Sequence, residues 1–133
     1  LCGMANNKGG QIIFGIKDKP HIAIGITNSK FRDTDPANID RLIREYFSQE
    51  LIWHSNILEF DGKEFIQIWV QEAENKPVLC KKNKDNILRE GAIYYRYRAE
   101  TKEIEFPELK NLLDKEKEKE KNLWMQHIQK IAQ

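Results

Sequence analysis

Two adjacent glycines stand between a short helical segment and an apolar strand in the stretch MANNKGGQIIFGIKD, residues 4–18. Phosphate loops of the P-loop or dinucleotide kind need the opposite order, because phosphate binds the free amides at a helix N-terminus. Here Gly9 and Gly10 follow a helix C-terminus, whose dipole repels phosphate. The order therefore predicts a helix stop and a turn into the strand, not a nucleotide cradle.

Size and charge limit what else the chain can do. Its 133 residues are 40% hydrophobic and 32% charged, which is enough to bury one core. Lys and Arg total 22 against 21 Asp and Glu, so the net charge is only +1. A strongly basic surface is excluded, and any contact with nucleic acid must come from a local patch.

The remaining chemistry-bearing residues are scattered. Cys2 and Cys80 form no CxxC pair, and the sequence lacks the His spacing of a zinc site, so we expect free thiols in a reducing cytoplasm and no bound metal or cofactor. His21, His54 and His127 stand apart from any nucleophile, which indicates structural or surface roles. No apolar run reaches the roughly 20 residues that span a bilayer.

Short apolar runs bounded by turn residues predict the strands. Asp61-Gly62 is the strongest hairpin signal in the chain. After it, Ile66, Ile68 and Val70 are expected to point to one face, with Trp69 on the other. The expected strands are 11–17, 21–27, 56–60, 64–70, 93–98 and a short edge strand at 78–80.

Two longer segments predict helices. Thr34-Asp35-Pro36 provides an N-cap and a first-turn proline for a helix over Ala37–Gln49, which should cover the sheet. A second helix begins near Pro107 and continues to the end of the chain. We therefore expect an α+β fold with a mixed or antiparallel sheet of about five or six strands, divided into residues 1–105 and a charged amphipathic helix over 106–133.

The C-terminal helix contains the run KEKEKEK, in which opposite charges at i,i+3 and like charges at i,i+4 nearly cancel. This run is either a solvated connector or a spacer that holds the following apolar turns away from the domain. In the second case those turns would pair with a partner or with a second chain. The predicted contact residues are Leu123, Trp124, Ile128 and Ile131.

Several motifs resemble the Schlafen AlbA-like domain, also known as the divergent AAA-4 family, of the bacterial type. The stretches 5–10, 13–18 and 24–26 resemble its AFANTxGG…hxIGVxD…GI signature, and 94–101 aligns with its YhRxGSxT element. Arg98 and Ala99 replace the usual Gly-Ser. The family's opening strand, with its glutamates, would precede Leu1, so we expect the chain to lack that segment.

The resemblance implies nucleic-acid binding. Some members act as endoribonucleases that use two of those upstream glutamates and an aspartate at the position of Asp18. Alone, Asp18 cannot hold a catalytic divalent metal, because such a site needs several converging carboxylates. A turn residue at a strand end is the alternative reading of Asp18.

The residues themselves offer a basic patch. Arg96 and Arg98 alternate with Tyr95 and Tyr97, so the arginines are predicted to share one face and meet phosphates. Alternatively, the tyrosines are core residues and the arginines a solvated face. The preceding loop would extend the patch with Lys81, Lys82, Lys84 and Arg89.

Three functions follow. We expect first a DNA- or RNA-binding module, the targeting part of a transcriptional-regulator-like or defence-type protein. The alternatives are a metal-dependent endoribonuclease domain that needs its upstream glutamates, and a non-catalytic module that pairs chains through the C-terminal helix.

Overall fold

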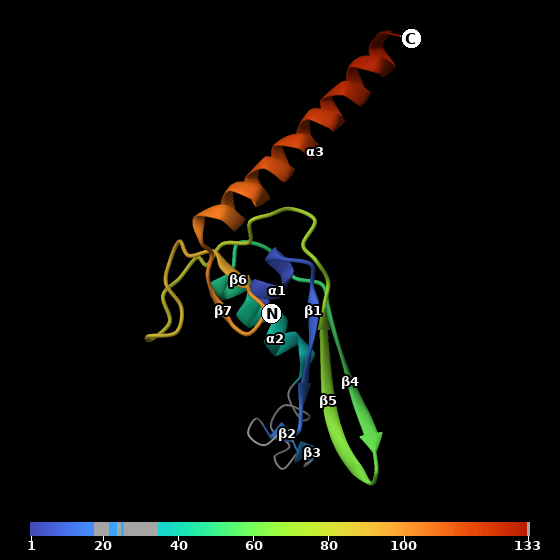
Figure 1. Ribbon diagram of the computed structural model, residues 1–133, viewed down its shortest axis with the longest axis vertical. Coiled ribbons are helices and arrows are strands. Elements are labelled where there is room, and N and C mark those ends of the chain that lie inside the picture. The colour runs from blue at the N-terminus through green and yellow to red at the C-terminus, as the bar shows by residue number, and fades with distance from the viewer. Residues whose placement is uncertain (18–21, 24, 26–34, 133) are drawn as a thin grey trace.

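The computed structural model describes residues 1–17, 22, 23, 25 and 35–132, which form an α+β structure (Figure 1). The elements follow the order α1, β1, β2, β3, α2, β4, β5, β6, β7 and α3. The predicted class, with antiparallel pairing and a long C-terminal helix, is confirmed. The predicted turn 18–20, including Asp18, lies outside the described residues.

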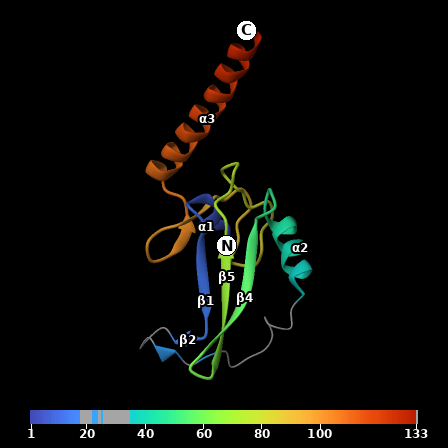
Figure 2. The same cartoon turned by 90° about the vertical axis from the view of Figure 1, so that its right-hand side faces the viewer.

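The largest sheet places β5 (Lys63–Val70) between β1 (Gly10–Phe14) and β4 (Trp53–Phe60), with both pairings antiparallel (Figure 2). β4 and β5 form the predicted hairpin. Asp61 and Gly62 have φ values of 53° and 73°, as a two-residue turn with positive φ at both positions requires.

Burial along β5 follows the predicted alternation. Ile66, Ile68 and Val70 are 3%, 4% and 0% exposed, whereas Trp69 on the opposite face is 43% exposed. Phe65 is the exception, because it is buried on the face of Trp69 and packs against the backbone of Gly15. One sheet face thus belongs to the core and the other is largely open.

The strands do not join into one sheet of five or six. Among the described residues, two further ladders are separate from the main sheet: β2 (Ile16–Lys17) with β3 (Ile22–Ala23), and β6 (Tyr94–Arg96) with β7 (Thr101–Glu103). The predicted strand over 11–17 breaks at Gly15, which has a φ of 112°. β7 was not predicted, since its three residues show no apolar alternation.

Gly9 forms the turn between α1 (Cys2–Asn6) and β1. Its φ of 77° lies in the left-handed region, and its N–H donates to the carbonyl oxygen of Met4 at 2.8 Å. This is the helix-ending conformation that favours glycine. Gly10 is not among the positive-φ glycines and begins β1, so of the predicted pair only Gly9 has the left-handed conformation of the turn.

α2 (Pro36–Tyr46) begins as predicted and ends three residues early. The carboxylate of Asp35 accepts a hydrogen bond from the Ala37 N–H at 3.0 Å, so it caps the helix. Ile43 packs into a core shared by α1, α2 and the end of β5, composed of Cys2, Ala5, Ile43, Leu51, Val70 and Val78.

The predicted edge strand Val78–Cys80 forms a single antiparallel bridge, between Cys80 and Phe47 just after α2. Val78 and Cys80 are buried at 0% and 1% exposure. Cys2 is also buried, and neither thiol forms a disulfide. Burial raises the pKa of the Cys2 thiol to about 12, so this thiol is a poor nucleophile at neutral pH.

α3 (Phe106–Ala132) leaves the rest of the molecule after its first turns, and its C-terminal half extends away from it in both views (Figures 1 and 2). Leu112 is buried, whereas Phe106 and Leu113 are 73% and 42% exposed. None of the described helices is both long enough and apolar enough to cross a membrane.

Replacing Gly9 by Ala should destabilise the fold more than replacing Gly62 by Ala. Both residues have nearly the same positive φ, which costs a side chain about 1–2 kcal/mol. Only at Gly9 would the added Cβ also lie 2.6 Å from the carbonyl oxygen of Val70, whereas Gly62 has nothing within 4 Å. Urea denaturation measures the difference, and equal losses in the two variants would contradict the close approach at Gly9.

Candidate nucleic-acid interface

The predicted arginine patch lies on the β6–β7 hairpin. Tyr95 pairs with Lys102 and Arg96 with Thr101, and the N–H of Tyr97 donates to the Glu100 carbonyl oxygen at 2.8 Å, which closes the turn. The rings of Tyr95 and Tyr97 meet edge to face at 5.2 Å. The two tyrosines therefore share one side of the hairpin, and strand alternation places Arg96 on the other.

Arg96 and Arg98 differ in how the structure holds them. The guanidinium of Arg96 donates across the ladder to the Thr101 hydroxyl at 3.4 Å, and Arg98 is exposed in the turn. Neither arginine forms an ion pair with a carboxylate within the described part of the chain. Their charges are consequently available to an anion outside the molecule.

Two asparagines of α1 and its C-cap hold this hairpin. The side-chain amide of Asn6 donates to the Tyr94 carbonyl oxygen at 2.8 Å, and that of Asn7 donates to the Arg96 carbonyl oxygen at 2.9 Å. Carbonyls two residues apart on a strand point to the same side. The side chains of Asn6 and Asn7 thus supply the hydrogen bonds that a neighbouring strand would otherwise donate to this edge of β6.

Asn6 also fixes the segment that follows the cis peptide bond before Pro77. Its amide group donates to the Val78 carbonyl oxygen at 3.1 Å and accepts from the Val78 N–H at 2.7 Å. The residue is 1% exposed. A buried amide is stable only when its donors and acceptor are satisfied, and these bonds supply that.

Gly3 lets α1 approach the hairpin closely. A Cβ at this position would lie 2.6 Å from the Thr101 methyl group and 3.3 Å from the Arg96 nitrogen. No larger side chain fits without moving the hairpin. Sequence analysis did not single out Gly3, Asn6 or Asn7, although adjacent asparagines before a helix-ending glycine were a visible signal.

The remaining basic residues fall into two groups. Arg89 donates to Glu103 of β7 at 2.5 Å, which places it at the open end of the hairpin and raises the pKa of its guanidinium. Lys82 and Lys84 lie over the ring of Tyr46 at the end of α2, 5.5 and 5.1 Å from its centroid.

Carboxylates neutralise part of the predicted patch. Lys82 pairs with Glu45 at 2.8 Å, and this hydrogen bond raises the pKa of Lys82 and lowers that of Glu45. Lys81 is exposed and its backbone bonds to Tyr46. The six predicted basic residues thus do not form one continuous positively charged surface. Of the six, Arg96 and Arg98 are the ones that lie on the hairpin.

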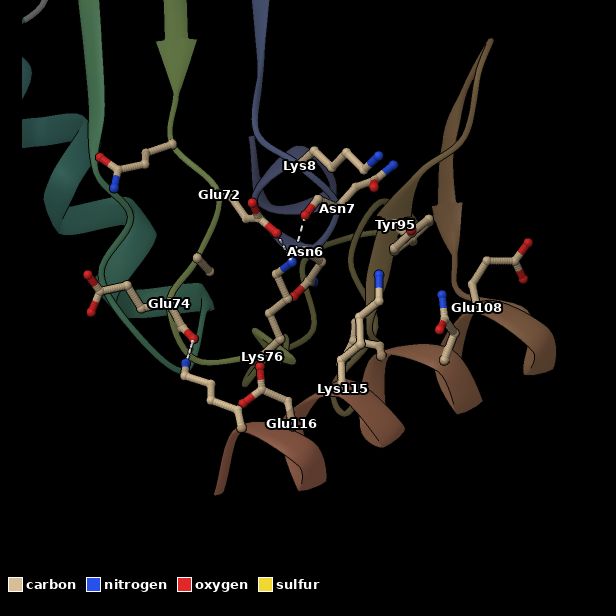
Figure 3. A pocket seen from close by; sticks show the side chains of 15 residues that line it. Asn6, Asn7, Lys8, Glu72, Glu74, Lys76, Tyr95, Glu108, Lys115 and Glu116 are labelled. Carbon is tan, nitrogen blue, oxygen red and sulfur yellow. Dashed lines mark hydrogen bonds and ion pairs between the residues drawn. The ribbon is translucent and has the colours of Figure 1, made fainter. Parts of the chain in front are cut away.

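A cleft of about 760 Å³ opens beside Tyr95, between the end of α1, residues 71–76 and α3 (Figure 3). Its charges are of both signs, and three of the charged side chains that line it are engaged within the domain. Lys76 pairs with Glu72 at 2.5 Å, which lowers the pKa of Glu72, and it donates to the Asn7 carbonyl oxygen. Lys119 of α3 donates to the Glu74 carbonyl oxygen. The Lys119 bond attaches α3 to the domain.

The other candidate residues from the sequence, Asp18 and the histidines, do not come together in one site among the described residues. Asp18 lies outside the described residues, and no group of three His, Cys, Asp or Glu that could hold a metal occurs in the described part. His54 stacks on Trp69 on the open sheet face, with ring centroids 5.5 Å apart. This exposed pair is a surface that sequence analysis missed.

Comparison with known proteins tests the family resemblance of the two motif blocks, residues 5–26 and 94–101. Residues 1–105 match the family described as Schlafen, AlbA_2. The chain belongs to this family. The two motif blocks of this Schlafen AlbA_2 domain, about 90 residues apart, meet in the structure through Asn6 and Asn7 on one side and β6 on the other.

One curated relative is an "Uncharacterized ATP-binding protein" of Ureaplasma parvum serovar 3. It is 32% identical over 128 residues, which cover 86% of this chain and 36% of the relative. The chain therefore spans little more than a third of that protein's length. No solved structure matches the chain significantly.

Replacing Asn6 by Ala should cost about 3 kcal/mol of unfolding free energy, because it leaves the Val78 N–H buried without a partner and removes the amide donor from the Val78 and Tyr94 carbonyl oxygens. Asn56→Ala is the matched control, since Asn56 is exposed on β4 and its side chain makes no hydrogen bond among the described residues. Chemical denaturation compares them. Similar stabilities for the two variants would show that Asn6 does not hold the structure.

Proposed function

We propose that this Schlafen AlbA_2 domain binds nucleic acid and that the β6–β7 hairpin contacts the sugar–phosphate backbone. The observation that carries the proposal is the position of Arg96 and Arg98 on a hairpin held by the family's own Asn motif. Both arginines lack a carboxylate partner within the described residues, in contrast to Lys82 and Arg89.

Arginine suits this role physically. Its planar guanidinium donates two parallel hydrogen bonds to a phosphate, and its charge is retained at any physiological pH. Two such groups on a short hairpin are a small patch, which agrees with the net charge of +1. We therefore expect modest affinity that falls steeply with salt, since binding releases counterions from the polynucleotide.

A rigid support favours binding by this hairpin. A three-residue ladder alone is marginally stable in water. The bonds from Asn6 and Asn7 and the close contact at Gly3 order the strand before a ligand arrives. Less conformational entropy is then lost on binding.

The name of the Ureaplasma relative raises nucleotide binding as a second possibility for the chemistry of this chain. The cleft beside Tyr95 is large enough for a nucleotide, but Lys76 and Lys119, which line it, already bond to groups of the domain. The sequence also has no GxxxxGK loop. The binding experiment described below therefore adds ATP as a competitor of the polynucleotide.

The nuclease alternative would require Asp18 together with the upstream glutamates that the family resemblance implies. The described residues provide no group of three metal-ligating side chains. We extend the nucleic-acid-binding proposal to the role of this domain, as the part that targets a larger regulator or defence-type protein to nucleic acid.

The double variant Arg96→Glu with Arg98→Glu should lose most binding to polynucleotide and reduce the slope of log affinity against log salt by about 2. Fluorescence anisotropy with single-stranded RNA, single-stranded DNA and duplex DNA measures this at low and near-physiological salt. ATP added to the bound complex reports whether nucleotide competes.

Arg41→Glu with Arg44→Glu on α2 is the control, because it changes the net charge equally at another exposed surface. It should retain most of the affinity. An affinity of the Arg96 and Arg98 variant equal to wild type at low salt would refute the hairpin as the contact surface.

A further inference from the structure

The last turns of α3 carry a stripe of exposed apolar side chains. Trp124, Ile128 and Ile131 are 61%, 59% and 72% exposed. Their spacing of four and three residues places them on one side of the helix. Leu123, which sequence analysis grouped with them, points about 100° away from Trp124 and lies outside the stripe.

The stripe faces away from the domain to which α3 is attached. Leu112 is buried against the domain and Lys119 bonds to the Glu74 carbonyl oxygen. At about 100° per residue, Ile128 points about 180° away from Lys119. A straight helix cannot bring both sides to the same domain, so the described domain leaves the stripe uncovered.

The same side of α3 continues back to the start of the helix as an exposed seam whose residues are separated by three, four or seven positions, the periodicity of a coiled coil. Its two ends are apolar and its middle is charged. Phe106 and Leu113 are exposed at one end, and Trp124 and Ile131 at the other. The seam comprises Phe106, Leu113, Lys117, Glu120, Trp124 and Ile131.

Two copies of this seam place opposite charges against each other only when the two helices run in opposite directions. We propose that α3 pairs with the α3 of a second copy in antiparallel orientation, about a two-fold axis between residues 118 and 119. Lys117 then lies opposite the partner's Glu120. Each Leu113 meets a Trp124, and each Phe106 meets an Ile131. Parallel pairing would instead place lysine opposite lysine and glutamate opposite glutamate, which destabilises a helix pair.

The charged middle of the seam provides the first test, by sedimentation equilibrium of the full chain over a range of concentrations. Wild type should have the mass of two chains at high concentration. Lys117→Glu and Glu120→Lys should each lower the mass to one chain, because like charges then meet across the axis. The double variant should restore the dimer, since the opposite pairs are re-formed with their signs exchanged.

Glu118→Lys is the matched control, because Glu118 is exposed but lies on another side of α3. It should dimerise like wild type, and circular dichroism should show equal helix content in all variants. A single-chain mass for wild type at every concentration would overturn the proposal. Failure of the double variant to recover the dimer would overturn the Lys117–Glu120 pairing.

Disulfide trapping tests the orientation. Leu113→Cys with Trp124→Cys should form a covalent dimer under mild oxidation, because the two new thiols meet across the axis. Within one helix they are about 16 Å apart and cannot bond. Leu113→Cys alone should stay uncrosslinked, and a covalent dimer of this single variant would show parallel pairing instead.

Discussion

The buried side chain of Asn6 joins three parts of the chain that are distant in sequence. Its amide group satisfies the N–H and carbonyl of Val78 and the carbonyl of Tyr94, while its own residue sits at the end of α1. Removing such a group from a dry site leaves several backbone groups unpaired, so the arrangement is stable as a unit and costly to break in part. The position of β6, and with it the arginine hairpin, depends on this residue together with Asn7.

This arrangement separates two roles within the family motif. Asn6, Asn7 and Gly9 are structural, because they end α1 and bind backbone groups of β6 and of α1 itself. Arg96 and Arg98 are the part that can meet a ligand. Under the proposed function, Gly9 contributes only through the hairpin that α1 supports and needs no direct contact with phosphate. If α3 pairs two chains, two such hairpins act together, and linked sites on one polynucleotide bind more tightly than either alone.

Local signals predicted the local structure well. Asp61-Gly62 specified its hairpin, Asp35-Pro36 specified the start of α2, and alternation along β5 specified the buried face. The failures concern interactions between distant residues. The partners of Lys82 and Arg89 are Glu45 and Glu103, which lie 37 and 14 residues away, so no local pattern could show that the basic patch is partly neutralised. β7 is recognisable only by its pairing with β6, and the bonds of Asn6 depend on contacts across more than 70 residues.

The most direct test of this account is an NMR titration of the isotope-labelled chain with a short single-stranded RNA or DNA at low salt, followed by backbone amide and arginine side-chain signals. The account predicts that the largest shift changes fall on residues 94–103 and on the guanidinium groups of Arg96 and Arg98. Changes centred on His54 and Trp69 of the open sheet face, or an absence of change anywhere, would contradict it.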